Sequence, residues 1–510
     1  MTDDNDYDVL VVGAGLSGIG AGVHLQERCP NKRFAILEGR ERTGGTWDLF
    51  RYPGVRSDSD MFTLGYPFRP WQDTRTIAPG EAILDYIRQT AQEYELGRHV
   101  QLQRRVRRAS WSSATARWTV EADAGERGEL VRYTCNFLYL CSGYYRYEHG
   151  YLPEFPDADT FRGPLIHPQQ WPTELAVSGK RVVVIGSGAT AVTLVPALAA
   201  QGADVTMLQR SPTYVLALPS VDPLSGLLRR VLPAKTAAGI NRLKNVWLTM
   251  LFFESSRRWP RLMRRLLRLQ TRLLLGRRFD VDRHFSPSYA PWDQRVCIAA
   301  DADLFRALRK GEASIVTEHI ERFVPEGIRL QSGQTLAADV IVSATGLDLV
   351  PLGDIAFDID GQALDPGRTL TYKGMMFSGV PNLAQATGYT NASWTLKCDL
   401  TNRYLCRLLN FMEQRGYRTC TPRPADPDVA TLPFVDFSSG YVQRAIDRFP
   451  KQGSKAPWRL YQNYVRDLLS LRYARLEDDV LEFGPAPTAA TPPLAATTRR
   501  GAGPAGRDAA

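Results

Sequence analysis

Short apolar runs, many of them rich in valine and isoleucine, recur along the chain and end in turns of small or polar residues. They cover residues 7–12, 34–37, 137–140, 181–185, 204–208 and 339–343. Apolar runs of this length between turn signals are typical of strands buried on both faces, as in parallel sheets. Two of the runs lead into glycine-rich turns, so the pattern predicts an α/β fold with two Rossmann-like dinucleotide-binding domains.

The first glycine-rich turn is Gly13-Ala14-Gly15-Leu16-Ser17-Gly18, and a helical pattern follows it. In a strand, turn and helix of this kind, the first glycine permits the turn and the second lets the backbone approach a pyrophosphate. The third glycine allows the helix to pack closely on the strand. Glu38 ends the next strand, where a carboxylate binds ribose hydroxyls and repels the 2′-phosphate of NADP. We therefore expect FAD here, bound by Gly13, Gly15, Leu16, Ser17, Gly18 and Glu38.

The second glycine-rich turn is Gly186-Ser187-Gly188-Ala189-Thr190-Ala191, with alanine at the third position. The strand after it ends in Arg210 and Ser211 and carries no acidic residue at its tip. An arginine and a hydroxyl at that place can hold a 2′-phosphate through charge-assisted hydrogen bonds. This site is expected to prefer NADPH, and the alternative is that Arg210 is an ordinary surface residue. One FAD site followed by one NADPH site implies hydride transfer to the flavin.

Residues 219–293 are predicted to be a mostly helical insertion. At about 100° per residue, four leucines share one helix face and four arginines share the neighbouring face. The leucines are Leu262, Leu266, Leu269 and Leu273, and the arginines are Arg261, Arg265, Arg268 and Arg272. The favoured expectation is that this helix packs on the NADPH domain and leaves the arginines in solvent. The alternative is peripheral contact with an anionic membrane surface.

Composition and charge narrow the class of protein. At 510 residues the chain is long enough for two or three domains. The seven cysteines form no C-x-x-C pair, which indicates reduced thiols in the cytoplasm and argues against a zinc site or a redox disulfide. No secretion signal or membrane span is expected.

The net charge is +9, but residues 221–285 alone carry fifteen Lys or Arg against four Asp or Glu. Because the basicity is local, no nucleic-acid partner is expected.

Two motifs carry a resemblance to a known family. The stretch Gly44-Gly45-Thr46-Trp47, followed by Arg51-Tyr52-Pro53-Gly54 and Asp58, resembles the second fingerprint of the Baeyer-Villiger monooxygenases. The stretch from Phe161 to Pro172 matches their signature F-x-G-x-x-x-H-x-x-x-W at Phe161, Gly163, His167 and Trp171. Related monooxygenases that oxidise nitrogen or sulfur usually place another aromatic residue at the position of Trp171. The variant His-Pro-Gln, with Trp-Pro after it, looks like the ethionamide-activating branch of the family.

The resemblance implies a mechanism and roles for residues. NADPH reduces FAD, O₂ adds to the flavin at C4a, and the resulting peroxide attacks a ketone to give an ester or lactone. Arg295 stands at the family's catalytic arginine and Asp58 at its acidic partner, although a structural ion pair between domains is the alternative. A fixed cation stabilises an anionic peroxide in a site closed to water. Gly45, Thr46, Trp47 and Val106 would bind FAD together with Asp58. This sequence departs from the family pattern at Gln294, where many members have a lysine that helps to bind the 2′-phosphate of NADPH.

Other positions are less specific. The signature would couple domain movement to catalysis, but His167 and Trp171, four residues apart, also fit a packed pair at a helix start. Asn391 and Trp394 are candidates for the substrate pocket, although an exposed loop with a buried tryptophan has the same pattern. The competing functions are a nitrogen- or sulfur-oxygenating flavin monooxygenase, a flavin-dependent disulfide reductase, and a binding protein without enzyme activity.

The predicted crossover points between the two nucleotide units give the domain limits. The FAD domain is expected at 1–147 and 347–485, and the NADPH domain at 148–218 and 294–346. The basic helical insertion occupies 219–293. Residues 486–510 are rich in Ala, Pro, Thr and Gly and are expected to be disordered.

Overall fold

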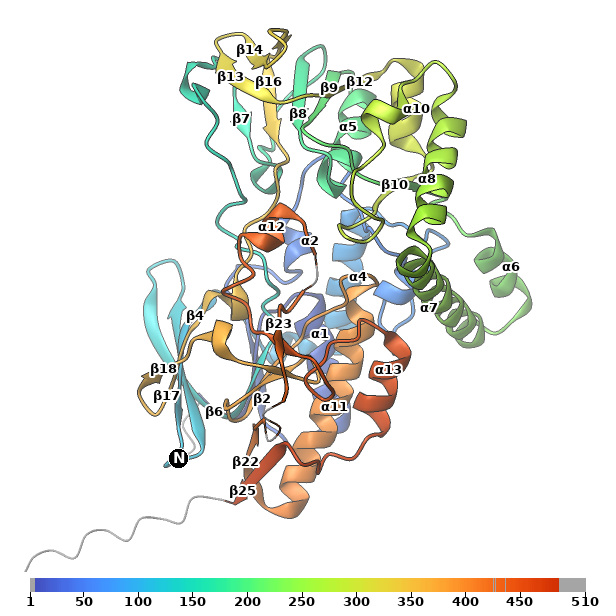
Figure 1. Cartoon of the computed structure of the whole chain (residues 1–510). Coiled ribbons are helices and arrows are strands. Elements are labelled where there is room, and N and C mark those ends of the chain that lie inside the picture. Colours follow the sequence, from blue (N-terminus) through green and yellow to red (C-terminus); the bar gives the residue numbers. More distant parts are fainter. Residues whose placement is uncertain (1–4, 425, 427, 436, 486–510) are drawn as a thin grey trace, which may run out of the picture.

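The computed structural model describes residues 5–485, apart from 425, 427 and 436 (Figure 1). The predicted tail at 486–510 lies outside the described residues. Within the described part, no helix combines the length and the apolar character that crossing a membrane requires. The seven cysteines are all described, and each is a buried free thiol.

The larger sheet has nine strands and is built from two distant parts of the chain. Its order is β18-β17-β4-β5-β6-β1-β2-β3, and β21 pairs with β6. The strands are β1 (Asp6–Val12), β2 (Phe34–Leu37), β3 (Val100–Gln101), β4 (Arg104–Ser112), β5 (Arg117–Ala124), β6 (Glu129–Leu140), β17 (Ala356–Ile359), β18 (Gln362–Ala363) and β21 (Leu383–Gln385). In register, Val12 lies beside both Leu37 and Leu140. The carboxyl ends of β1, β2 and β6 therefore meet at one edge, where parallel α/β sheets bind ligands.

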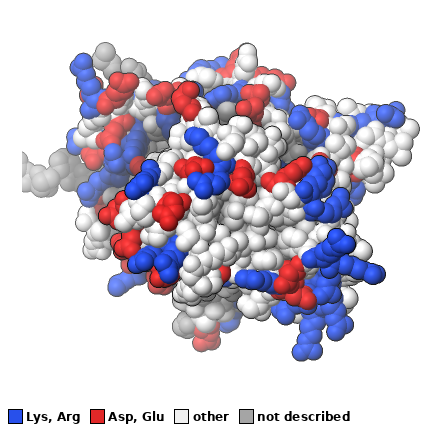
Figure 2. All heavy atoms as spheres, turned by 90° about the horizontal axis from the view of Figure 1, so that it is seen from above, with Lys and Arg blue, Asp and Glu red and all other residues white. Residues whose placement is uncertain are grey.

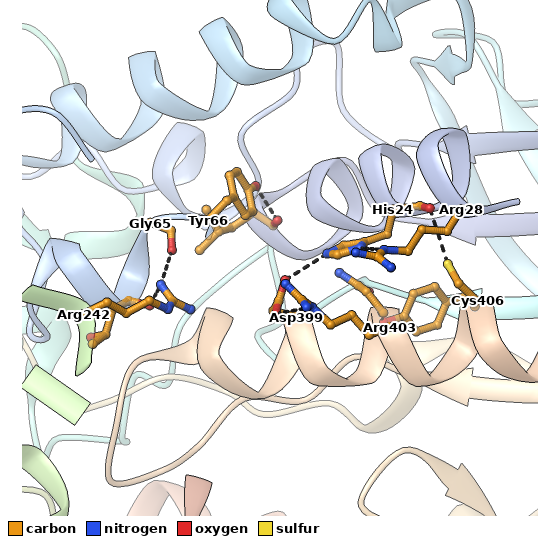
Figure 3. A network of polar contacts seen from close by, with 12 residues as sticks. His24, Arg28, Gly65, Tyr66, Arg242, Asp399, Arg403 and Cys406 are labelled. Atoms are coloured by element: carbon orange, nitrogen blue, oxygen red, sulfur yellow. Dashed lines mark hydrogen bonds and ion pairs between the residues drawn. The ribbon is translucent and has the colours of Figure 1, made fainter. Parts of the chain in front are cut away.

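Helices pack on this sheet through a large apolar core. They are α1 (Leu16–Arg28), α4 (Gly80–Glu93) and α11 (Trp394–Arg415). A polar network also joins α1 to α11, as Figure 3 shows. The His24 Nε2 atom lies 2.9 Å from Asp399, which also accepts a hydrogen bond of 2.9 Å from Arg403. The Arg28 guanidinium donates to His24 Nδ1 at 3.2 Å, so the neutral imidazole carries its proton on Nε2 and donates it to Asp399.

The smaller sheet is wholly parallel, with the order β12-β9-β8-β16-β7. Its strands are β7 (Leu165–Ile166), β8 (Arg181–Ile185), β9 (Asp204–Gln209), β12 (Ala313–Thr317) and β16 (Val340–Ser343), and α5 (Ala189–Ala200) and α10 (Asp303–Lys310) cover it. Valine and isoleucine fill β8 and β16 because both strands are buried on two faces. The predicted strands in both halves of the chain are confirmed to within one or two residues, except that β6 begins at Glu129, eight residues before the run predicted at 137–140. The domain limits themselves stay a prediction.

The predicted helical segment is confirmed between β10 (Val215–Leu218) and β11 (Cys297–Ala300), which pair in parallel. It contains α6 (Pro223–Val231), α7 (Ala234–Arg258), α8 (Pro260–Leu275) and α9 (Val281–His284). Helices α6, α7 and α8 lie at the right-hand side of the molecule in Figure 1. Arg242 of α7 donates hydrogen bonds to the carbonyl oxygens of Phe62 and Gly65 (Figure 3), so the insertion is anchored to the larger-sheet part.

Helix α8 packs beside α10 of the smaller-sheet part, as expected, but it does not pack through its leucine row. Leu262, Leu266, Leu269 and Leu273 are 51, 48, 53 and 74% exposed. The helix packs instead through Leu267, Thr271 and Leu275, which lie on the opposite face. The amphipathic periodicity predicted the helix correctly. It did not predict which face packs on the protein, because leucines occur on two opposite faces of the helix.

The remaining elements are short and mostly connect or extend these layers. They are α2 (Thr46–Leu49), α3 (Met61–Leu64), α12 (Gly440–Gln443), α13 (Tyr464–Leu468), β13 (Ile320–Val324), β14 (Gly327–Leu330), β15 (Thr335–Ala337), β19 (Thr371–Tyr372), β20 (Met376–Phe377), β22 (Tyr417–Pro422), β23 (Thr431–Leu432), β24 (Gln452–Gly453) and β25 (Leu481–Pro485). Strands β14 and β15 pair in antiparallel fashion and form a hairpin around Ser332 and Gly333.

Candidate active site

The first glycine-rich loop has the close approaches that a dinucleotide cradle requires. Gly13 has φ +103°, and a Cβ there would lie 2.6 Å from the carbonyl oxygen of Cys141. A Cβ on Gly18 would lie 1.8 Å from the carbonyl oxygen of Gly13. Helix α1 begins after Gly15 without a side-chain cap, so the first backbone N–H groups of the helix point to the loop. Uncapped N–H groups at a helix start bind phosphate oxygens, and these residues fit a pyrophosphate.

Glu38 lies at the end of β2, beside this loop, and is only 5% exposed. One carboxylate oxygen accepts from the backbone N–H of Ala14 at 2.7 Å, and the other accepts from that of Arg40 at 3.0 Å. Burial raises the pKa of Glu38, and the two backbone donors oppose that rise. The carboxylate lines the cavity beside the loop. Each oxygen keeps a lone pair for a further donor, such as a ribose hydroxyl.

The second fingerprint packs directly on the first loop. The N–H of Gly44 donates to the carbonyl oxygen of Ala14 at 3.1 Å. Gly45 has φ +57°, and a Cβ there would lie 2.9 Å from the Cα of Gly15. The predicted residues Thr46, Trp47 and Val106 line the same cavity, as do Gly13, Gly15, Leu16 and Ser17. Gly18 does not line the cavity, and its contacts assign it to helix packing.

The second glycine-rich loop repeats this geometry at the smaller sheet. Gly186 has φ +138°, and a Cβ there would lie 2.4 Å from the carbonyl oxygen of Ala344. Helix α5 begins after Gly188 without a side-chain cap. Ser187 Oγ lies 2.8 Å from Thr213 Oγ1. Arg210 and Ser211 are exposed at the end of β9, outside the lining of the cavity.

One cavity of about 470 Å³ reaches both loops, although at the second loop Ala189 and Thr190 line it and Gly186, Ser187 and Gly188 do not. Its walls include the first loop and its neighbours, and they also include Ala189, Thr190 and Thr193 of α5. A shared cavity places the two nucleotide-binding loops where bound cofactors can meet, which a hydride transfer requires.

Asp58 and Arg295 lie together in the wall of this cavity, with Asp58 Oδ2 2.9 Å from an Arg295 Nη atom. Asp58 precedes α3 of the larger-sheet part, and Arg295 precedes β11. The Arg295 side chain is 30% exposed, and that surface faces the cavity. Burial alone lowers the pKa of Arg295, but the Asp58 carboxylate and neighbouring tyrosines raise it above its usual value. The guanidinium is therefore a permanent cation.

Three tyrosines surround the guanidinium, and sequence reasoning missed them. Tyr144 and Tyr145 follow β6, and Tyr441 lies in α12. Burial raises the pKa of all three phenols, so they stay neutral beside the cation. The two adjacent tyrosines directly after the crossover at Cys141-Ser142-Gly143 were the available signal. Nothing near Tyr441 in the sequence indicates its place.

A second, mainly apolar cavity begins on the other side of Arg295. Four residues line both cavities: Tyr144, Arg295, Tyr389 and Trp394. The apolar part of the wall consists of Leu349, Phe434, Val435, Phe437, Val442, Ile446, Phe449 and Leu460. A polar end holds Lys397 and Asp467, whose ion pair of 2.8 Å is almost fully buried. Tyr389 donates to the same Asp467 carboxylate at 2.7 Å.

Trp394 and Asn391, the two candidates for the substrate pocket, lie in different places. Trp394 lines both cavities, and its indole Nε1–H donates to Ser17 Oγ at 2.7 Å. Asn391 is buried but does not line either cavity, and its amide donates to the carbonyl oxygen of Gln462 at 2.9 Å. Asn391 therefore supports the Gln462 segment of the cavity wall.

The signature residues lie at the crossover between the two sheets. His167 Nδ1 accepts from the N–H of Gln169 at 3.2 Å, so the neutral ring donates through Nε2 to the carbonyl oxygen of Gly346 at 2.9 Å. A Cβ on Gly150 would lie 1.9 Å from the His167 ring, so this glycine admits the imidazole. Trp171 follows a 3-10 turn and packs on the smaller-sheet core. His167 is also the N-cap of that 3-10 turn (Pro168–Gln170), as the alternative of a helix start implied, and its ring contacts the two crossover segments.

The other two signature residues have packing roles. Phe161 is buried, and its ring lies edge-on to Phe323 with centroids 6.4 Å apart. A Cβ on Gly163 would lie 2.4 Å from the carbonyl oxygen of Asp339.

The Arg51-Tyr52-Pro53-Gly54 stretch also joins the two parts. A Cβ on Gly54 would lie 2.7 Å from the carbonyl oxygen of Thr193 in α5. Burial raises the pKa of Tyr52, and the Thr190 and Thr193 side chains near its hydroxyl oppose that rise. Arg56 pairs with Asp303 of α10. Sequence reasoning missed this interface because its partners lie far apart in the chain.

Comparisons with known proteins bear on the class of this site. The family described as "Flavin-binding monooxygenase-like" matches residues 60–222, and "NAD(P)-binding Rossmann-like domain" matches residues 11–75. The chain is 51% identical to the FAD-containing monooxygenase EthA of Mycobacterium tuberculosis over 481 residues, which cover 94% of this chain and 98% of that protein. It is 46% identical over 483 residues to the probable FAD-binding monooxygenase AlmA of Acinetobacter baylyi, with 94% and 96% covered.

Solved structures share the fold. An oxidized steroid monooxygenase bound to NADP matches with a TM-score of 0.70 at 22% identity, covering 82% of this chain and 88% of that one. An open crystal structure of cyclohexanone monooxygenase matches with a TM-score of 0.67 at 20% identity, covering 82% and 90%.

Fold, site and relatives together define an NADPH-dependent flavoprotein monooxygenase with FAD as its second cofactor. Two dinucleotide cradles on one cavity are the structural basis of that class. The chain belongs to the family of FAD-containing monooxygenases that includes EthA and AlmA. The resemblance drawn from the sequence is confirmed at the level of family and fold.

Proposed function

We propose that this protein oxidises ketones to esters or lactones with NADPH and O₂, a Baeyer-Villiger oxidation. The observation that carries the proposal is the place of Arg295, a permanent cation paired with Asp58 where the cofactor cavity meets the apolar cavity. When bound, the flavin takes electrons from NADPH and supplies the activated oxygen atom. Nucleophilic oxygen transfer to a carbonyl carbon develops negative charge, which a fixed cation stabilises.

The surroundings of Arg295 leave its positive charge available to stabilise a negatively charged group. Tyr144, Tyr145 and Tyr441 stay neutral, so they do not compensate the guanidinium charge. Within the described residues, Asp58 is the carboxylate that pairs with Arg295, and this ion pair orients the guanidinium. The phenylalanines and valines of the neighbouring cavity exclude water, and a fixed charge acts more strongly in a dry site.

The same proposal assigns the cofactors to the two loops. FAD would bind along the first loop, with Glu38 at its ribose and the Gly44-Gly45-Thr46-Trp47 stretch beside it. NADPH would bind along the second loop, with Ser187, Gly188, Ala189 and Thr190 at its pyrophosphate. Arg210 and Ser211 would hold its 2′-phosphate, which fits their exposed place at the end of β9. The crossover contact of His167 with Gly346 positions the two halves and does not touch the reacting atoms.

A substrate panel tests the function. Purified holoenzyme is given NADPH and O₂ with linear, aryl and cyclic ketones and, separately, with sulfides, and the products are identified by mass. We expect ester or lactone from at least one ketone class. Arg295→Ala is expected to lose ester formation by about a hundredfold or more while its flavin is still reduced by NADPH. Arg295→Lys, which keeps the charge, is the matched control and is expected to retain more activity.

Two results would contradict the proposal. Sulfoxide formation without ester from any ketone would assign the protein to the nitrogen- and sulfur-oxygenating monooxygenases. Equal ester formation by Arg295→Ala and the parent would remove the role given to the guanidinium.

A further inference from the structure

Most of the large apolar side chains that are exposed in the described part of the chain lie in the helical insertion. Large apolar side chains in α6, α7 and α8, and at the joint between the last two, are at least 43% exposed. They are Leu224, Leu227, Val231, Ile240, Leu243, Trp247, Leu248, Leu251, Trp259, Leu262, Leu266, Leu269 and Leu273. Exposed leucines scattered singly are normal, but a contiguous apolar patch indicates a binding surface.

On α8 the exposed leucines form one row that points away from the protein. At about 100° per residue, Leu262, Leu266, Leu269 and Leu273 fall within one narrow sector of the helix. The buried residues Leu267 and Thr271 fall in the opposite sector. The helix therefore has two apolar faces, and only one of them packs on the fold.

Helix α7 shows the same arrangement. Its exposed residues Ile240, Leu243, Trp247 and Leu251 recur at helical spacing and share one face. Its inner residues, Val246 and Met250, pack against Tyr389 and Leu396. Arg242 anchors this inner face to backbone carbonyls of the larger-sheet part. A helix fixed on one side with a leucine and tryptophan stripe on the other resembles an interfacial membrane helix.

Unpaired cations flank the leucine row of α8. In the part of the chain that the structure describes, Arg261 and Arg265 are exposed and make no ion pair, whereas Arg268 and Arg272 share Asp282. Blue side chains gather at the lower right of Figure 2, on the side where Figure 1 places α7 and α8. Arginine beside an apolar stripe fits anionic lipid headgroups. A second copy of the chain docked on the same face would bring like charges together, so the charge argues against that occupant.

We propose that the exposed face of α6, α7 and α8 binds peripherally to an anionic phospholipid membrane. Leucines and the two tryptophans enter the boundary between headgroups and acyl chains, and the arginines lie among the headgroup phosphates. The inner face of α7 contacts Tyr389, which lines both cavities, so the membrane-bound face lies behind the wall of the candidate substrate cavity. An apolar substrate dissolved in the bilayer would then be close to the site.

Flotation of the FAD-loaded protein tests the proposal independently of any activity. The vesicles contain equal parts phosphatidylglycerol and phosphatidylcholine, or phosphatidylcholine alone, at about 50 mM and about 500 mM salt. We expect the parent protein to float with the anionic vesicles at low salt, to float much less at high salt, and to stay at the bottom with phosphatidylcholine. The triple variant Leu266→Gln, Leu269→Gln, Leu273→Gln and the double variant Arg261→Gln, Arg265→Gln are each expected to reduce flotation by about tenfold or more.

Matched controls separate this face from general surface changes. Leu130→Gln and Leu469→Gln replace leucines that are each 57% exposed outside the insertion, and both are expected to float like the parent. Flavin absorbance of each variant checks that it is folded. Absence of flotation at low salt would overturn the proposal. So would a dimer, measured by light scattering, that the triple leucine variant dissolves while neither protein floats.

Discussion

The Asp58 carboxylate lies 2.9 Å from the Arg295 guanidinium, and the two residues come from the parts of the chain that carry the two nucleotide loops. One ion pair therefore joins the two halves at the wall of the cofactor cavity. A second ion pair, Arg56 with Asp303, joins the same halves away from the apolar cavity. Variants of the two ion pairs can therefore be compared to separate a role in catalysis from a role in holding the two halves together.

We predict that Asp58→Asn lowers kcat for ester formation by about tenfold, because the guanidinium loses the anion that orients it. Flavin content and reduction by NADPH are expected to remain. Asp303→Asn is the control, since it breaks an interdomain pair that does not touch Arg295, and Asp303 lines neither cavity. Stopped-flow measurements of flavin reduction and of product formation check both steps. Equal losses in the two variants would assign the Asp58 pair to stability alone.

Glu38 provides a prediction on cofactor binding. Glu38→Gln replaces an acceptor of two backbone N–H groups by an amide that can accept with only one of its atoms. Loss of a hydrogen bond to a charged group costs about 1.5–3 kcal/mol, so the Kd for FAD is expected to rise by about tenfold or more. Flavin fluorescence after dilution measures its release. Glu41→Gln, a change at an exposed carboxylate three residues further along the chain, is expected to bind FAD like the parent.

Arg210 provides a prediction on cofactor choice. Arg210→Ala removes the cation expected at the 2′-phosphate, so KM for NADPH is expected to rise by about tenfold while KM for NADH changes little. Arg322→Ala, at an exposed arginine of β13, is the control. Flavin reduction is followed with each nucleotide. A similar rise with NADH would show that Arg210 does not contact the phosphate.

Local signals account for what the sequence predicted well. The strands before each glycine-rich loop, the loops themselves and Glu38 follow from short-range patterns, because turn geometry and strand burial depend on neighbouring residues. The Asp58 and Arg295 pair was predicted only through family resemblance. Nothing in the composition or spacing around either residue indicates that they meet, since the contact forms between distant segments.

Features that depend on packing between distant segments were missed or misjudged. Tyr441 reaches Arg295 from the late segment that closes the apolar cavity, and no local pattern indicates it. The leucine row of α8 was expected to be inside, because an amphipathic helix usually buries its apolar stripe. This helix has apolar residues on both faces, and periodicity alone does not determine which face meets the fold.

His167 provides a prediction on pH dependence. Burial lowers the pKa of His167 below its usual value of about 6.5, and the hydrogen bond to Gly346 partly opposes that effect. The unfolded chain therefore binds a proton at a higher pH than the folded one. The stability that the neutral imidazole contributes is fully present above about pH 6.5 and is lost as the pH falls below that value toward the folded pKa.

His167→Gln keeps a donor for Gly346 but cannot titrate. At pH 7.5 we expect the variant to lose about 1 kcal/mol, because the replaced hydrogen bond is less well placed. Between pH 7.5 and 5.5 the parent is expected to lose more of its free energy of unfolding than the variant, as measured by urea unfolding of the FAD-loaded proteins. His319→Gln, at an exposed histidine outside the crossover, controls for removing an imidazole. If the parent and His167→Gln lose the same free energy over this range, the buried imidazole does not stabilise the crossover in its neutral form.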